Sequence, residues 1–546
     1  IQRRFLNILP SIKCIKKEEV FCQIRAISKK RISLLDLILI GMGAIFGSAW
    51  LFAVSNVASK AGPAGSFSWI IGGVIILLIG LVYAELGAAL PRTGGIIRYP
   101  VYTHGHLVGY LISFITIVAY TSLISIEVTA VRQYVAYWFP GLTIKGSESP
   151  TIIGWLLQFA LLCLFFLLNY WSVKAFAKSN LIISVFKYFV PLTIIIVLIF
   201  HFKSANFAGE FAPFGFGGVQ TSISTGGVMF AYLGLHPIVS VAGEVKNPQR
   251  NIPVALLICI IVSACVYTIL QVVFIGAIPT DMLNDGWKAI GREFSLPFKD
   301  IAVLLGMGWL ATLVVLDAIL SPGGNGNIFM NTTSRLVYAW ARNGTLFKIF
   351  AKVNKPTGIP RPSLWLSFAL AVFWTLPFPS WDALVNVCSV ALILSYAIAP
   401  VSAAALNVNA KQLKKPLQIK GMAVIAPVSF IFASYIVYWS GWNTVSWLLG
   451  SQLVMFAVYC ACKKYVPQDD VSFAQQLKSS WWIVGYYVML LILSFLGSFG
   501  NGLGLLRTPV DLILIALGSI AVFYWAKYTA LPKAVIDYDE KKEETV

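Results

Sequence analysis

Charged residues are scarce in this chain of 546 residues, at 12% of the sequence, whereas soluble domains carry about 25%. Acidic residues are the scarcer kind, with 22 Asp and Glu against 41 Lys and Arg. Hydrophobic residues make up 58% of the chain, and its mean hydropathy is +0.80. This balance excludes a soluble globular domain and predicts an all-α integral membrane protein.

Cysteine and histidine are also few, with 8 and 4 residues. The cysteines are scattered, and the closest pair, Cys460 and Cys462, has neither a second pair nor a histidine nearby. Neither a zinc site nor a disulfide framework is therefore expected. No nucleophile–base arrangement or phosphate loop is visible either, so we expect no enzyme, no metal and no cofactor.

Apolar runs long enough to cross a bilayer recur along the chain, and we predict about fourteen spans. The eleventh and twelfth are divided by the polar stretch Ser440-Gly441-Trp442-Asn443. The predicted spans are 34–57, 66–90, 107–139, 151–171, 179–201, 218–243, 253–278, 300–323, 363–379, 383–406, 421–439, 444–462, 481–499 and 509–528.

The basic residues are distributed unevenly among the loops. Most of them fall on one side of the membrane when the N-terminus is placed in the cytoplasm. This predicts a multi-pass plasma (inner) membrane protein with both termini cytoplasmic. We expect the net charge of +19 to face anionic lipid headgroups rather than nucleic acid. Residues 1–33 are predicted to form a basic cytoplasmic tail and 529–546 a charged cytoplasmic tail, in which the run from Asp537 to Glu544 is expected to be solvated and disordered.

The first span is interrupted by Gly41, Gly43, Gly47 and Ser48. Glycine disfavours a continuous helix, and broken backbone at membrane depth is tolerated where it lines a cavity or is covered by protein. A broken helix there offers free N–H and C=O groups to a carboxylate and an ammonium. The alternative is close packing of helices on small residues. The glycine spacing does not match the dinucleotide fingerprint.

The sixth span is also interrupted, by Gly226-Gly227 and by the run from Phe230 to Pro237. Proline removes a backbone donor, so nearby carbonyls lose their partners. Two broken spans that lie five spans apart are typical of an inverted-repeat transporter. This pairing favours a transport site over simple packing.

Several motifs resemble the amino acid–polyamine–organocation permeases, above all Gly43–Ala49, Gly243–Pro253 and Ser334–Gly344. Within that family the chain is most similar to the bacterial aspartate–proton symporter branch, through Pro91–Tyr102 and Ser321–Gly324. The resemblance implies a LeuT-like 5+5 inverted repeat with discontinuous spans 1 and 6. The transport core would be 34–406, with 34–201 and 218–406 as its repeats, and 421–528 would hold peripheral helices.

The resemblance also implies where an amino acid would bind. Its carboxylate would lie on the N–H groups of Gly47, Ser48 and Ala49, where the family often has glycine in place of Ala49. Its ammonium would lie on carbonyls of both broken spans. Those carbonyls are near Ala44, Ile45, Phe230, Ala231, Leu233 and Gly234.

Lys187 and His236 are the candidates for proton coupling. A lysine at the bilayer centre is costly, and some relatives use a lysine in span 5 as the proton carrier. The alternative is that Lys187 extends to the cytoplasmic face. His236 lies where several relatives carry a glutamate, and it could titrate, contact an acidic side chain or be a neutral hydrogen-bonding residue.

Other residues in the spans are candidates for side-chain or gating contacts. Phe46 and Tyr232 could line the cavity, although ordinary packing explains them as well. Arg132 and Asp317 are charged within spans, as is Glu127, which we expect to pair away from Arg132. An acidic substrate would need a cation, and the sequence does not select among Arg132, Lys187 and His236.

We therefore predict a secondary active amino acid transporter that takes up an acidic amino acid, aspartate or glutamate, by proton-coupled alternating access. The proton is the coupling ion, and the partners are the small-molecule substrate and membrane lipid. An amino acid exchanger or a neutral amino acid permease remains an alternative, as does a non-transporting amino acid sensor. A channel is disfavoured, because the chain has paired broken helices rather than rings of charge. The oligomeric state is undetermined.

Overall fold

The computed structural model describes residues 32–90, 94–171, 173–232, 234–241, 245–354, 356–413, 415–462 and 471–536. Within these ranges the chain is a bundle of helices, and the β pairing consists of isolated bridges such as that of Ile32 with Val245. The predicted all-α class is confirmed. The predicted tail 1–33 lies outside the described residues except for its last two.

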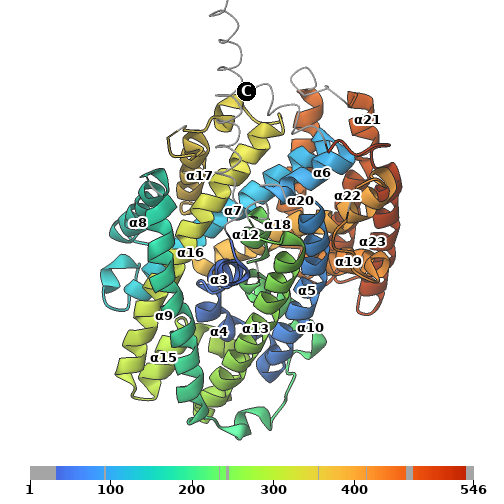
Figure 1. Cartoon of the computed structure of the whole chain (residues 1–546). Helices are drawn as coiled ribbons and strands as arrows, with labels where there is room; N and C mark the ends of the chain where they lie inside the picture. The colour runs from blue at the N-terminus through green and yellow to red at the C-terminus, as the bar shows by residue number, and fades with distance from the viewer. Residues whose placement is uncertain are drawn as a thin grey trace, which may run out of the picture.

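The helices run back and forth between two ends of the bundle (Figure 1). We call the end with α6 and α21 the α6 end, and the opposite end, with α15, the α15 end. The helices are α3 (Leu34–Ile45), α4 (Ala49–Ala61), α5 (Gly65–Ala89), α6 (Gly95–His104), α7 (His106–Val135), α8 (Ile152–Trp171), α9 (Val173–Ile199), α10 (Gly215–Thr225), α11 (Val228–Ala231), α12 (Leu235–Ser240), α13 (Pro248–Ala277), α14 (Trp287–Glu293), α15 (Pro297–Leu304), α16 (Gly308–Arg342), α17 (Arg361–Trp374), α18 (Trp381–Asn409), α19 (Met422–Trp439), α20 (Trp442–Ala461), α21 (Phe473–Lys478), α22 (Trp481–Leu496) and α23 (Val510–Thr529).

Helices α7 and α18 form the centre of the bundle. In their most apolar windows, 83% and 94% of the residues are buried inside the protein. Helix α16 packs along α7, α18 packs on both α7 and α19, and α13 packs along α5 and α3. Helices that are apolar on all sides are stable in this position, because other helices enclose them.

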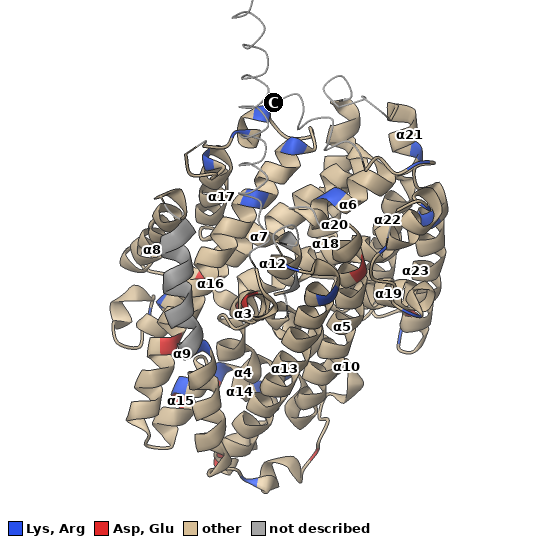
Figure 2. Cartoon of the chain, in the orientation of Figure 1, with Lys and Arg blue, Asp and Glu red and all other residues tan. Residues whose placement is uncertain are grey.

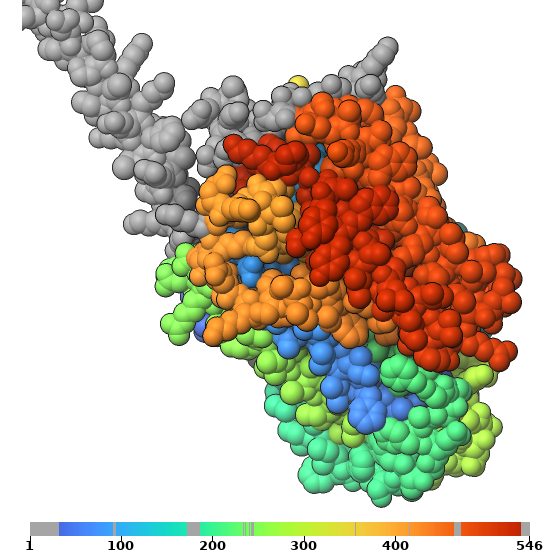
Figure 3. All heavy atoms as spheres, turned by 90° about the vertical axis from the view of Figure 1, so that its right-hand side faces the viewer, coloured from blue at the N-terminus to red at the C-terminus, as the bar shows by residue number. Residues whose placement is uncertain are grey.

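Helices α19 to α23 cover one side of this bundle (Figure 3). Helix α19 contacts α18, α5 and α23, and α22 packs between α20 and α23. These helices fall within the region predicted to be peripheral, 421–528. The division into core and periphery, and into two repeats, stays a prediction.

Both predicted breaks are present. Helix α3 ends at Ile45 and α4 begins at Ala49. In the sixth span, α10 ends at Thr225, Gly227 has a φ of 93°, and the two segments are bent by 43°. A φ in this left-handed region is readily adopted by glycine. Spans 1 and 6 are therefore discontinuous, as expected.

The predicted number of fourteen spans is not confirmed. Among the described residues, nine helices are long and apolar enough to cross a membrane, or ten if the bent pair counts as one span. The predicted span 300–323 is divided between α15 and α16, because the chain turns at Gly306, which has a φ of 73°. The predicted division at Ser440–Asn443 is found, since α19 ends just before it and α20 begins within it.

The first part of the predicted C-terminal tail 529–546 packs against the bundle. The N–H groups of Leu531 and Val535 donate to the carbonyls of Thr103 and Tyr102 in α6, and that of Ala534 donates to Asn409 in α18. Residues 530–536 therefore lie against the α6 end of the bundle, where many Lys and Arg residues also gather (Figure 2). Residues 537–546 lie outside the described part.

We predict that Gly441→Ala destabilises the outer helices. Gly441 has a φ of 83°, and an added Cβ would lie 2.6 Å from the Cα of Gly500. Backbone cannot move aside cheaply, so the free energy of unfolding should fall by about 1–3 kcal/mol. Thermal unfolding of the purified protein in detergent measures the change.

Gly450→Ala is the matched control within α20, because an added Cβ there meets nothing within 4 Å. Its unfolding temperature should equal or exceed that of the parent chain. Equal stability of the two variants would contradict the tight turn at Gly441.

Candidate functional site

The end of α3 leaves three successive carbonyls without helical partners, and side chains from three other helices take them up. Lys187 Nζ in α9 donates to the carbonyl of Gly43 at 2.6 Å. The amide nitrogen of Asn325 in α16 donates to Ala44 at 3.1 Å. The hydroxyl of Tyr267 in α13 donates to Ile45 at 3.0 Å. Orphan carbonyls at a helix end require such partners when they are buried, so the break is held from three sides.

The start of α4 presents backbone N–H groups to a carboxylate of the chain itself. Ser48 N donates to Glu127 Oε2 in α7 at 3.1 Å. The Ser48 hydroxyl accepts from Trp381 Nε1 in α18 at 2.9 Å. The N-terminus of a helix attracts negative charge, and Glu127 supplies it here. Sequence analysis placed a substrate carboxylate at this position and did not include Glu127 in the site.

Gly47 is required by a close approach. A Cβ at this position would lie 2.0 Å from the amide nitrogen of Asn325 and 2.6 Å from Glu127 Oε1. The bare backbone therefore lets the broken segment contact both polar side chains at once. Ala49, the first residue of α4, follows Ser48 and is 2% exposed.

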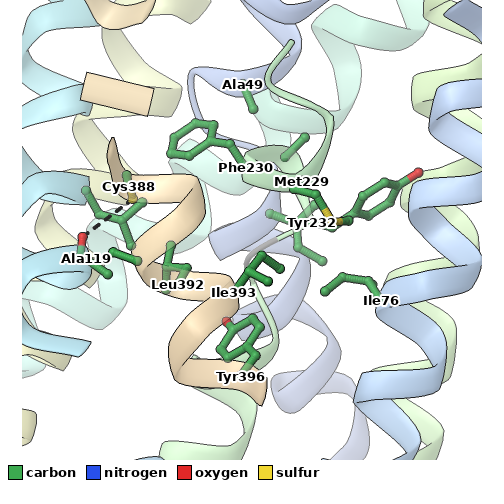
Figure 4. Packing of buried hydrophobic residues seen from close by; sticks show 14 of the residues in the cluster. Ala49, Ile76, Ala119, Met229, Phe230, Tyr232, Cys388, Leu392, Ile393 and Tyr396 are labelled. Atoms are coloured by element: carbon green, nitrogen blue, oxygen red, sulfur yellow. Dashed lines mark hydrogen bonds between the residues drawn. The ribbon is translucent and has the colours of Figure 1, made fainter. Parts of the chain in front are cut away.

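The broken part of span 6 packs closely on the broken part of span 1. A Cβ on Gly234 would lie 2.2 Å from Ile45 Cγ1 and 2.9 Å from the carbonyl oxygen of Gly41. The ring of Phe230 meets that of Trp381 edge-on, with centroids 5.5 Å apart. Figure 4 shows Phe230 beside Ala49, with Tyr396 further along the same buried region. The two interrupted spans thus lie directly against each other.

Asn325 connects the buried charges. Its side-chain oxygen accepts from Lys187 Nζ at 2.6 Å, and its nitrogen lies 3.4 Å from Glu127 Oε1. Lys187 is 0% exposed and Glu127 is 1% exposed. An isolated buried charge is very costly, and opposite charges joined by hydrogen bonds reduce that cost. Lys187 is thus tied to the break and does not extend toward either end of the bundle.

The predicted site residues of the two breaks lie together, namely Ala44, Ile45, Gly47, Ser48, Ala49, Phe230, Ala231 and Gly234. Leu233 lies outside the described residues. Ala231 is the last residue of α11, and its N–H donates to Gly227. Which of these residues contact a substrate stays a prediction.

Arg132 is not brought to this site. Its guanidinium donates to the Thr143 hydroxyl at 3.0 Å and to the carbonyls of Glu148 and Pro379 at 2.7 and 3.0 Å. It therefore fastens the loop after α7 to the start of α18. The expectation that Glu127 and Arg132 have separate partners agrees with this geometry.

The two aromatic candidates, Phe46 and Tyr232, lie within the breaks and pack against aromatic rings of neighbouring helices. The ring of Phe46 contacts Tyr188 and Tyr267, at 5.7 and 5.1 Å between centroids. It borders an apolar groove of about 400 Å³ between α3, α9 and α13. The Tyr232 hydroxyl donates to the Trp69 carbonyl in α5 at 2.8 Å.

His236 and Asp317 are both buried, and neither hydrogen-bonds to the broken segment of span 1 among the described residues. The His236 ring lies 4.9 Å from that of Tyr120, and neither ring nitrogen has a partner among the described residues. Tyr120 precedes Glu127 by seven residues, or about 10 Å along α7. Asp317 Oδ1 accepts from the Ser321 hydroxyl at 2.8 Å within α16.

Asn325, Tyr267 and Trp381 were not predicted to belong to the site, and Glu127 had no predicted role in it. Of these four residues, only Glu127 could have been recognised as a site residue from the sequence, because an acidic residue inside an apolar span is rare. The other three are ordinary residues of apolar helices, and only their folded positions bring them to the breaks.

Comparisons with known proteins agree with one another. A family model described as amino acid permease matches residues 32–462. The chain is 80% identical to the aspartate-proton symporter of Bacillus subtilis, over 94% of this chain and 99% of that protein. It is 36% identical to the glutamate/serine transporter AimA of the same species, over 91% and 93%. It is 23% identical to the branched-chain amino acid permease BcaP, over 79% and 92%.

We predict that Gly47→Ala destabilises the protein by about 1–3 kcal/mol, the cost of overpacking. The added methyl group must displace the Asn325 amide and the Glu127 carboxylate from the break. Thermal unfolding in detergent measures this loss. In Gly43→Ala, the matched control, the new Cβ meets only Ile328 Cδ1 at 4.0 Å. An unfolding temperature for Gly47→Ala equal to that of Gly43→Ala would argue against this packing.

Proposed function

The chain belongs to the amino acid permease family, and we propose that it imports an acidic amino acid together with protons. Aspartate is the expected substrate. It is a multi-pass membrane transporter and not an enzyme. The observation that carries the proposal is its near full-length similarity to the aspartate-proton symporter. The paired breaks of spans 1 and 6 support a site at their meeting point.

The substrate's carboxylate would bind at the start of α4, on the N–H groups of Gly47, Ser48 and Ala49. Because Ser48 N already donates to Glu127, the incoming carboxylate must displace Glu127 or share this end of the helix with it. The ammonium would bind the carbonyls of Ala44 and Ile45. The Ala44 oxygen accepts one side-chain hydrogen bond and has a second lone pair available. The Ile45 oxygen already accepts from the Tyr267 hydroxyl and from the Gly47 N–H, so binding there would have to replace the Gly47 hydrogen bond, which would also free that N–H for the carboxylate. Carbonyls near Phe230 and Ala231 would complete the site.

The side-chain carboxylate of the substrate would need a cation. Arg132 is engaged by the loop after α7, which leaves Lys187 and His236 as candidates. Lys187 has the stronger claim, because it contacts the broken segment directly. His236 packs against Tyr120 instead.

Lys187 is the proposed proton carrier. When it is protonated, its ammonium donates to Gly43 and Asn325 and fixes α3 against α9 and α16. When it loses the proton, one donor and the positive charge beside Glu127 disappear. The contacts that hold span 1 then weaken, and spans 1, 2, 6 and 7 can move against the rest of the core. Proton loss toward the cytoplasm would thus be coupled to opening on that side.

The α6 end would face the cytoplasm. Lys and Arg residues gather there (Figure 2), which agrees with the positive-inside rule. Both termini would then be cytoplasmic, in the plasma (inner) membrane, with anionic headgroups as neighbours of the basic residues. The transport core would be 34–406, and the helices within 421–528 would be peripheral.

Broader specificity is the second candidate. The relative that is 36% identical bears the name glutamate/serine transporter, so a neutral amino acid is compatible with this type of site. Exchange of one amino acid for another remains the alternative to symport.

Uptake of radiolabelled aspartate into liposomes tests the proposed function. With an inward proton gradient, aspartate should accumulate above its external concentration, and a protonophore should abolish the accumulation. Counterflow that is saturable and independent of pH, without accumulation, would indicate an exchanger. Uptake of serine but not aspartate would remove the acidic specificity.

We predict that Lys187→Ala abolishes proton-driven accumulation, because the remaining groups at the break cannot replace the cation on Gly43. Initial rates should fall to those measured with the protonophore. Lys288→Ala is the control, since Lys288 lies over the Phe214 ring, 5.6 Å from its centroid, outside the site. Full proton coupling in Lys187→Ala would refute this role.

A further inference from the structure

Asp317 is a buried carboxylate that the steps above do not use. It is 0% exposed in α16. Its Oδ1 accepts from the Ser321 hydroxyl at 2.8 Å, and its Oδ2 has no hydrogen-bond partner among the described residues. Burial of an unpartnered oxygen of a charged carboxylate is costly. The cost is relieved when the group carries a proton or meets water, so this carboxylate is suited to change its state.

Asp317 stands on a polar stripe that leads to the proton carrier. Asp317, Ser321 and Asn325 follow one another at four-residue intervals, so they lie along one side of α16. Asn325 accepts from Lys187 Nζ at the end of the stripe. Asp317 precedes Asn325 by eight residues, which places it about 12 Å nearer the α15 end.

Pro322 adds an acceptor beside the stripe. It lies inside α16 and has no N–H, so the Ala318 carbonyl cannot receive its usual helical hydrogen bond. A carbonyl oxygen, the Ser321 hydroxyl and the Asp317 carboxylate thus lie within two turns of one helix. Groups of this kind hold water in a buried place.

The charged and titratable groups around Asp317 come from three helices. Lys187 in α9 is the cation, and Glu127 in α7 lies beyond it on the far side of Asn325. Tyr134 in α7 is the titratable group near both Asp317 and Asp300 in α15. The Tyr134 hydroxyl donates to the Leu51 carbonyl, and Asp300 is paired with Lys299. Lys187 is therefore the group to which a proton on Asp317 would move.

We propose that Asp317 takes up the proton from the α15 end and passes it along the stripe to Lys187. This rests on the proposed function, in which the α15 end faces outward. In the step, the O–H bond of the Asp317 carboxylic acid breaks and an N–H bond forms on the neutral Lys187 amine. The pair changes from acid and amine to carboxylate and ammonium. External water then protonates Asp317 again. The Ser321 hydroxyl and water relay the proton, since each is both donor and acceptor.

Asp317→Asn tests the relay in liposomes. Proton-driven accumulation of labelled aspartate should fall about tenfold or more, and counterflow at equal pH should stay within about twofold, because only proton delivery is lost. Uptake should also lose its dependence on external pH. Asp317→Glu keeps the carboxylate and should restore accumulation, which a purely structural role would not predict.

Asp511→Asn is the matched control. Asp511 is also a buried carboxylate, but it lies in α23 and accepts from the Tyr438 hydroxyl at 2.9 Å. Accumulation and its pH dependence should be those of the parent chain. Ser321→Ala provides a second test of the stripe if Asp317→Asn does not fold, and it should slow accumulation without changing counterflow.

Two results would overturn the relay. Asp317→Asn could keep accumulation and pH dependence, or it could lose counterflow together with accumulation while remaining folded. Failure of the proposed function is distinct, because the parent chain itself would then show no proton-driven uptake of aspartate.

Discussion

Everything in the site depends on how the carbonyls at the end of α3 are satisfied. A helix that stops inside the bundle leaves these groups without partners in a place where water is scarce. Side chains of α9, α13 and α16 supply the missing donors. The break is therefore stable only while these helices keep their positions, and their positions are in turn fixed by the break.

Under the proposed role of Lys187 as the proton carrier, this dependence would make its protonation a structural event. Lys187 contributes both a donor to Gly43 and a positive charge near Glu127. In a poorly solvated interior the positive charge contributes strongly. When the amine is neutral, that charge is lost and the hydrogen bond to Gly43 is weaker, because it is no longer charge-assisted. Proton transfer can thus change the energy of the broken segment without any large movement at the lysine itself.

The two broken spans are joined by contacts that tolerate only small residues. Gly234 lies against Ile45 and Gly41, and Gly41 in turn lies against Ile238. Close backbone approach of this kind is how membrane helices associate, because burial of apolar groups gives little advantage in lipid. In the proposed transport cycle, spans 1 and 6 would therefore move as one body, and the bonds to α9, α16 and α18 would be those that change.

The sequence alone determined the helical membrane fold and the location of both breaks, because glycine and proline act locally on the backbone. It also singled out Lys187, since a charge inside an apolar run is conspicuous wherever it folds. Only the tertiary structure decided which side chains meet the breaks. Glu127, Tyr267 and Asn325 lie 79, 222 and 281 residues from the backbone groups they contact. It also removed Arg132 from the site by placing loop carbonyls within its reach. Hydrogen bonds across such separations follow from how helices pack, and a local pattern does not record that packing.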